Sequence, residues 1–375
     1  MNKKIVMIVV SVIVIVAVMI VGVMLWAKAQ RAPEQEESIN VGKEKSEIEV
    51  VPTMEDKISD NSMWCPTFQL VWNDMKNEVV KRDIVFNPQI TMVENLNKED
   101  FTSNMLSDSY YYKKYGVKTK QLKEEIEKGI KEKFNETSDI LDDFGWDEKN
   151  TVTEEDASRY FFYAMLKRDF EFPKEFDNLG EGEFGNSKEK TTYFGINNQT
   201  DKVVKNQVEV LFYHSKDEFA VLLNTKDKDE IILYKTKKGN NFNQIYKNMQ
   251  QAESSFNGNT DMQEKDELKV PVLNINEKKE YTELENQPFE TSDKTKPIAV
   301  IEKAIQTIKL KLNEKGGSIK SEAGIDMKLA SAVKDSEEDK PRYFYLDNDY
   351  VLFLREKGKE KPYFAAKIHD ISQFN

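Results

Sequence analysis

The sequence is poor in the residues on which many enzyme sites and small exported domains depend. Its 375 residues include one cysteine, Cys65, so no disulfide can form within the chain. The two histidines, His214 and His369, lie in no cysteine or carboxylate motif with the spacing of metal ligands. Glycine is scarce, at 15 residues, which disfavours the glycine-rich loops that cradle phosphates. A stable exported domain of this kind would have to rest on its own apolar core.

Common catalytic signatures are also absent. The chain contains no G-x-S-x-G elbow, no H-E-x-x-H helix motif and no P-loop. Acidic pairs such as Asp142-Asp143 and Glu154-Glu155 fit a solvated face or the start of a helix better than acid–base catalysis. The sequence therefore predicts that the chain is not an enzyme and uses no cofactor or metal.

The charge balance argues against nucleic acid as a partner. The chain has 67 acidic and 55 basic residues, which gives a formal net charge of −12. Nucleic-acid-binding proteins usually carry a basic patch or stripe. We interpret the mixed, acidic surface as a means of remaining soluble.

The N-terminus predicts a membrane anchor. Lys3 and Lys4 precede an apolar run over residues 5–26. As a helix this run would extend about 33 Å, enough to cross a hydrocarbon core of about 30 Å. The lysines favour a cytoplasmic tip, residues 1–4, and place the rest of the chain outside the cytoplasm. The alternative is a signal peptide cleaved at Ala27-Lys28-Ala29, but the run is longer than usual for such a signal.

Residues 27–60 predict a stalk that separates the anchor from a folded domain, residues 61–375. The segment holds many charges, Pro33 and Pro52, and no aromatic residue. Such a composition cannot bury enough apolar surface to offset the entropy lost on ordering. Part of it, residues 46–58, could instead form a first helix.

The domain predicts an α+β fold, with helices in its first half and strands in its second. Apolar residues at every fourth position, flanked by Glu–Lys pairs, predict a helix over residues 119–136. From about residue 190 onward, short apolar runs separated by charged turns predict strands. These runs are residues 208–213, 219–223, 230–234, 268–275, 305–312, 350–355 and 362–368.

Residues 305–329 show the alternation of apolar and polar residues that is typical of strands. The second part of this segment, however, lies where a loop would be expected. Ile308, Leu310 and Leu312 alternate with polar residues, and a turn-like Glu-Lys-Gly-Gly follows. The alternation then resumes with small or apolar residues at Gly317, Ile319, Ser321, Ala323, Ile325, Met327 and Leu329. Two interpretations remain open: an ordinary long hairpin, or a loop that can enter a sheet beside the preceding strand.

Several blocks of the chain, in order, resemble the serpin family. Asn313, Glu314 and Gly316 match the approach to the family's reactive loop, and Leu352-Phe353-Leu354-Arg355 matches its C-terminal hairpin. Lys167, Pro173 and Phe176 match one long strand, and Pro271 matches another. The resembling blocks are residues 61–66, 162–176, 208–223, 268–275, 309–316 and 344–368.

The resemblance implies a serpin-like fold with a large central sheet, smaller sheets, about eight helices and an exposed reactive-type loop. Serpins trap proteases when a protease cuts this loop and the freed loop enters the sheet as an extra strand. Together with the predicted membrane anchor, the resemblance implies a membrane-tethered inhibitor of extracellular serine or cysteine proteases. Its hinge would be Glu314, Lys315, Gly316 and Gly317, its inserting residues Ile319, Ser321, Ala323, Ile325 and Met327, and its scissile bond Ala330–Ser331.

Departures from the family pattern support an alternative function. Inhibitory serpins keep small residues after the hinge, whereas this chain has Ile319, Lys320 and Glu322. The family's polar cluster below the opening sheet is replaced, with Cys65 and Gln306 at two of its positions. The alternative is a non-inhibitory binding or structural protein on a serpin-like scaffold, because a fold does not fix a function.

Overall fold

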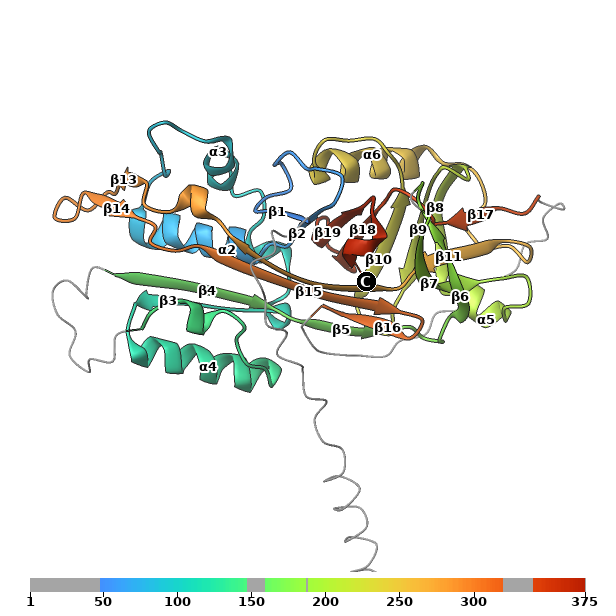
Figure 1. Cartoon of the computed structure of the whole chain (residues 1–375), viewed down its shortest axis with the longest axis horizontal. Coiled ribbons are helices and arrows are strands. Elements are labelled where there is room, and N and C mark those ends of the chain that lie inside the picture. The colour runs from blue at the N-terminus through green and yellow to red at the C-terminus, as the bar shows by residue number, and fades with distance from the viewer. Residues whose placement is uncertain (1–47, 147–158, 187, 320–339, 375) are drawn as a thin grey trace, which may run out of the picture. The chain divides into compact units, whose positions relative to one another are not determined.

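The strands of the second half of the chain form most of the sheet structure, as their sequence pattern predicts. The computed structural model describes residues 48–146, 159–186, 188–319 and 340–374. These residues form an α+β fold with one seven-stranded, two four-stranded and two two-stranded sheets (Figure 1). About eight helices were expected, but the described residues form five α-helices. These are α2 (Thr67–Asp74), α3 (Thr91–Asn97), α4 (Lys120–Phe134), α5 (Lys202–Lys205) and α6 (Phe242–Ser255).

The seven-stranded sheet holds the centre of the apolar core, in the order β1-β2-β19-β18-β10-β9-β8. Every residue of β10 is buried, because a strand covered on both faces exposes neither set of side chains. The predicted strands at 208–213, 219–223, 230–234, 350–355 and 362–368 are all confirmed here. The strands are β1 (Glu49–Val51), β2 (Ser62–Trp64), β8 (Val208–Ser215), β9 (Glu218–Asn224), β10 (Asp229–Lys235), β18 (Tyr350–Glu356) and β19 (Pro362–Ile368).

The two four-stranded sheets share a continuous stretch of chain that crosses between them at Val272. The strand predicted over residues 268–275 is therefore two strands, β11 in one sheet and β12 in the other. The first sheet has the order β17 (Tyr343–Tyr345), β11 (Glu267–Pro271), β7 (Glu189–Ile196) and β6 (Asp177–Phe184). The second has the order β12 (Leu273–Glu280), β15 (Ile305–Asn313), β16 (Gly316–Ile319) and β5 (Arg168–Glu171).

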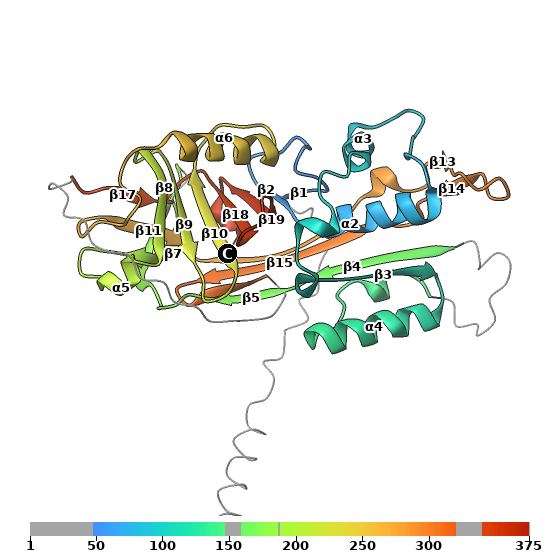
Figure 2. The same ribbon diagram turned by 180° about the vertical axis from the view of Figure 1, so that it is seen from behind.

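A two-stranded sheet of β3 (Tyr111–Val117) and β4 (Tyr160–Leu166) carries a helix on each side. Leu122, Ile126 and Ile130 of α4 form a buried cluster that includes Phe161 and Tyr163 of β4, so the predicted helix over 119–136 is confirmed. In both views α2 lies on the other side of β4 (Figures 1 and 2). The last sheet is the hairpin of β13 (Pro288–Glu290) and β14 (Ile298–Val300).

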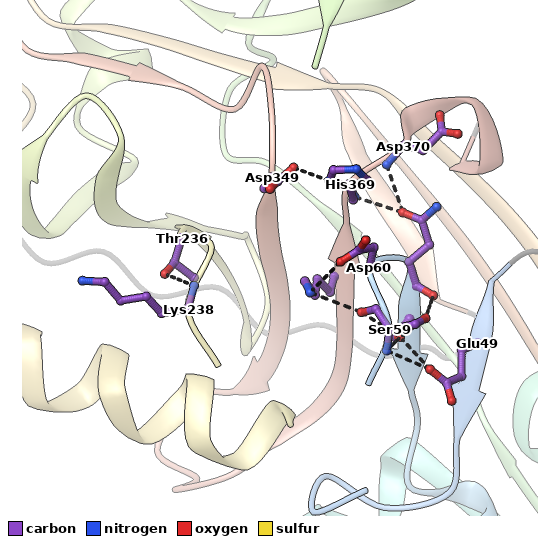
Figure 3. A network of polar contacts seen from close by, with 11 residues as sticks. Glu49, Ser59, Asp60, Thr236, Lys238, Asp349, His369 and Asp370 are labelled. Atoms are coloured by element: carbon purple, nitrogen blue, oxygen red, sulfur yellow. Dashed lines mark hydrogen bonds and ion pairs between the residues drawn. The ribbon is translucent and has the colours of Figure 1, made fainter. Parts of the chain in front are cut away.

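Polar contacts join the first described residues to the C-terminal hairpin (Figure 3). The Asn61 Oδ1 accepts hydrogen bonds from the backbone amides of His369 and Asp370, each at 3.0 Å. Ile48, Val50 and Val51 are buried, and β1 pairs in parallel with β2.

The stalk predicted over residues 27–60 is therefore wrong for residues 48–60, and the alternative of a helix over 46–58 is wrong for residues 48–58. The physical reason is long-range: β1 exists because β2 and the C-terminal hairpin supply its partner and its cover, which composition does not reveal.

The membrane prediction falls outside the described part of the chain. None of the helices within residues 48–146, 159–186, 188–319 and 340–374 is long and apolar enough to cross a bilayer. The predicted tip, anchor and remaining stalk, residues 1–47, lie outside these ranges.

Candidate functional site: a slot between two strands

A slot one strand wide lies between β4 and β15. At one end β16 fills the position between β15 and β5, pairing with both. β4 and β5 lie end to end, separated by Lys167, so β4 continues the line of β5 past the end of β16 (Figure 1). Among the described residues, β4 pairs with β3 alone, and residues 305–309 of β15 pair with β12 alone. The facing backbone edges of β4 and residues 305–309 of β15 thus have no described ladder partner. These edges define the slot.

The slot opens into a cavity of about 1280 Å³. Its walls are β4 and β15, and Phe68 and Trp72 of α2 line it from one side. Ser138 and Ile140, which follow α4 along the chain, also line it. Unpaired strand edges next to a lined cavity are the arrangement by which a sheet accepts an added strand.

A tight turn directs the chain into this slot. Asn313 and Gly316 are paired residues of β15 and β16, so Glu314 and Lys315 form a two-residue hairpin turn. Gly316 has φ +146°, and a Cβ there would lie 2.1 Å from the Phe170 carbonyl oxygen of β5. A side chain cannot occupy that space, so glycine is required for β16 to approach β5.

Gly316→Ala should therefore destabilise the fold by at least about 2 kcal/mol, because the methyl group forces β16 away from β5. Urea denaturation of the purified domain measures this loss. Gly145→Ala is the matched control, since no heavy atom lies within 4 Å of its added Cβ and the φ there is ordinary. We expect the control to stay within about 0.5 kcal/mol of the parent chain. Equal stability of the two variants would contradict the described β16–β5 contact.

A buried polar cluster joins β15 to the start of α2 at the floor of the slot. Gln306 Nε2 donates to the Cys65 carbonyl oxygen at 3.0 Å and to Thr67 Oγ1 at 2.9 Å. Gln306 Oε1 accepts from the hydroxyl of Tyr281, which is fully buried, at 2.8 Å. Burial raises the pKa of the Cys65 thiol to about 11, so this thiol is protonated at neutral pH and is a poor nucleophile.

A buried ion pair lies beside Ile319, the last described residue of β16. Arg168, which pairs with Ile319, is 1% exposed and donates through Nε to Asp229 Oδ1 at 2.8 Å, with a second bond through Nη2. The Tyr363 hydroxyl donates to the same carboxylate at 2.5 Å. The Arg168 guanidinium also stacks on Tyr110, 3.4 Å from the ring centroid. β5 is thereby tied to the seven-stranded sheet.

The far end of the slot is apolar and partly exposed. Tyr115, Phe162 and Tyr160 form a ladder of stacked rings, with centroids 5.6 Å and 6.5 Å apart along it. Ile298 and Val300 of β14 also line the cavity and are about half exposed. Exposed side chains of this kind favour an apolar partner.

The structure brings together those predicted site residues that it describes. Glu314 and Lys315 form the turn, Gly316 and Gly317 begin β16, and the Ile319 side chain is buried. An exposed reactive-type loop is therefore wrong for residues 316–319, which are held by ladder bonds on both sides. The remaining predicted residues lie outside the described ranges; these are Ser321, Ala323, Ile325, Met327, Ala330 and Ser331.

Sequence reasoning missed Arg168, Asp229, Thr67 and Tyr281. The first two carry a weak signal, because each is a charged residue at the edge of an apolar run. Tyr281 gives none, since its partner Gln306 is 25 residues away and their contact depends on how β12 pairs with β15.

The chain beyond residue 339 is tied down at Arg342. Its guanidinium donates to Asp266 Oδ2 through Nη2 at 2.7 Å, and to the Asn259 and Asp261 carbonyl oxygens, each at 2.6 Å. Asp266 is fully buried. Residues 320–339 thus connect two fixed points, Ile319 and Arg342.

Comparisons of sequence find no matching family model and no matching curated protein. Among solved structures, Serpin48 of the insect Tenebrio molitor is similar with 10% identity and a TM-score of 0.45, over 83% of this chain and 92% of that one. A thyroxine-binding globulin complex with thyroxine has 14% identity and a TM-score of 0.38, over 66% and 64%. Human thyroxine-binding globulin, also bound to its ligand, has 13% identity and a TM-score of 0.34, over 66% and 63%.

At such low identity a likeness concerns the fold and leaves ligands and activity open. The ordered blocks of the sequence resemble the serpins as well.

Proposed function

We propose that the slot accepts the chain beyond Ile319 as an added strand, and that the protein uses this insertion to inhibit serine or cysteine proteases. One observation carries the proposal: β16 pairs with both β15 and β5 as far as Ile319, and beyond this pairing the facing edges of β4 and β15 have no ladder partner among the described residues. A strand that continued β16 would satisfy both edges.

Continuing the register of β16 supports this proposal. Ile319 pairs with Arg168, so each further residue would meet the residue one position earlier on the opposite strand. Ser321 would then face Leu166, and Ala323 would face Ala164. At these positions the added strand would lie beside Gln306 and α2, which line the cavity.

The next inward positions suit the apolar end of the slot. In the same register Ile325 would face Phe162 and Met327 would face Tyr160. These side chains would cover the exposed aromatic ladder, and covering apolar surface favours insertion by about 25 cal/mol for each Å². Outward positions would include Lys320, Glu322 and Asp326, on the face of the sheet where Phe161 and Tyr163 of β4 pack against α4.

The bait bond should lie at Ala330–Ser331, several residues beyond the last inward position. The inhibitor proposal predicts a covalent complex, stable in denaturing gels, between the exported domain and at least one serine or cysteine protease. A released C-terminal peptide beginning near Ser331, measured by mass spectrometry, identifies the bond. An Ala323→Glu variant is the control, because it would place a charge in the slot and should turn the inhibitor into a substrate.

Cleavage without any complex, for every protease in a broad panel, would instead favour the second candidate, a non-inhibitory binding or structural protein. A specific observation favours this candidate too. Residues Gly316–Ile319 form a strand within the sheet of the uncut chain, so this part of the chain is not an exposed loop.

We also propose that the protein is anchored in the membrane by residues 5–26, with its folded domain outside the cytoplasm. The full-length chain should then require detergent for extraction, and deletion of residues 1–30 should leave the domain in the aqueous fraction. Cell fractionation with antibody detection measures both. Recovery of the intact full-length chain in the aqueous fraction would contradict the anchor.

A further inference from the structure

An ion pair joins the two walls of the slot at its far end. Arg159 immediately precedes β4, and Glu302 lies shortly before β15. The Arg159 Nη2 lies 2.9 Å from Glu302 Oε2. The two residues are 143 positions apart in the sequence and belong to opposite walls, and both line the cavity.

The spacing between strands in a sheet indicates where this ion pair lies relative to the slot. Neighbouring strands lie about 4.8 Å apart, so two strands that flank one absent strand lie about 10 Å apart. β16 shows that one strand fits between β15 and the line of β5 and β4. The side chains of Arg159 and Glu302 therefore extend across the path that an added strand would follow.

We propose that Arg159 and Glu302 form a latch across the far end of the slot. This latch holds β4 and β15 one strand apart, and it slows insertion of the part of the added strand that lies beyond the position paired with Ile305. The inference rests on the proposed function for its consequence, but the latch itself is a contact of described residues. If β16 continued in its register, position 324 would face Ile305, before the added strand reaches the latch.

The latch is suited to control the rate of strand insertion. Its side chains are 35% and 55% exposed, and pairs this accessible contribute little to global stability and are weakened by salt. Breaking this ion pair should therefore let β4 and β15 move more freely at the slot without unfolding the domain. Salt should do the same, because it screens exposed charges.

The test is amide hydrogen exchange of the exported domain, followed in peptides that contain β4 and residues 305–309. Glu302→Gln removes the charge and keeps the shape, and we expect exchange in these peptides to become about two- to fivefold faster. Raising the salt concentration should produce a similar change in the parent chain and none in Glu302→Gln. The double variant Arg159→Glu, Glu302→Arg should restore the parent rates.

Glu290→Gln is the matched control, because its exposed pair with Arg82, at 2.7 Å, lies outside the slot. Identical exchange in the Glu302→Gln and Glu290→Gln variants would overturn the latch. A second readout separates the two proposals: the rate at which thermal stability changes after cleavage within residues 320–339. Faster exchange in Glu302→Gln with no change in stability after cleavage would leave the latch standing and refute strand insertion.

Discussion

Cleavage of the folded domain after Leu329 should raise its thermal unfolding midpoint by about 7 °C. The freed strand would fill roughly eight positions beside β4, and each new hydrogen bond contributes about 0.5–1.5 kcal/mol. A net gain of about 5 kcal/mol shifts the midpoint of a chain this size by roughly that amount, since the entropy of unfolding is about 2.1 cal/mol/K for each residue. Calorimetry before and after cutting at a protease recognition site placed after Leu329 measures the shift.

The control for this experiment is the same cleavage in an Ala323→Glu variant. The register of β16 turns position 323 toward Ala164 and Gln306, where a carboxylate would be buried without a partner. We expect this variant to be cut as readily and to gain no stability. An equal rise in both proteins would show that the gain does not come from insertion into the slot.

Arg168→Met should destabilise the domain by about 3–5 kcal/mol, because it leaves the Asp229 carboxylate buried without its cation. Burial alone raises the pKa of Asp229, and the Arg168 guanidinium opposes that shift. The Asp229 side chain has no exposed surface in the structure. Urea denaturation gives the free energy of unfolding, and Arg82→Met, which breaks an exposed pair, should cost less than about 1 kcal/mol.

A triple variant separates the loss of the pair from the loss of packing. Replacing Arg168 by Met, Asp229 by Leu and Tyr363 by Phe removes the charges together with the hydroxyl that donates to them. We expect most of the lost stability to return, because no buried polar group is left unpaired. A loss below about 1 kcal/mol in Arg168→Met alone would contradict the described burial.

Local patterns in the sequence were sufficient for the elements whose partners lie nearby. The four-residue spacing of Leu122, Ile126 and Ile130 predicts α4, and the apolar runs of β9 and β10, separated by a charged turn, predict two strands, which the structure pairs with each other. β1 was missed because its three residues become a strand only beside β2 and the C-terminal hairpin. A short strand of this kind has no periodicity of its own to detect.

The site residues on β16 could be predicted from the sequence, but the site residues on the strands that pair with it could not. The alternation around Gly317 and Ile319 marks a segment able to enter a sheet, and the pair Gly316-Gly317 marks its turn. The opposite wall of the slot lies more than 130 positions earlier in the chain. The places of Arg168 and the aromatic ladder in the slot therefore follow only from the register in which β16 pairs with β5. Side-chain identity does not determine such a register without the partner strand.

Strand insertion into the slot is tested most directly by amide hydrogen exchange of β4 and of residues 305–309, measured before and after cleavage at position 329. The facing edges of these strands have no ladder partner among the described residues of the uncut chain. Insertion predicts that cleavage slows exchange in both peptides by at least about tenfold, while β10, already paired on both sides, stays unchanged. Unchanged exchange in β4 and residues 305–309 after complete cleavage would contradict the account.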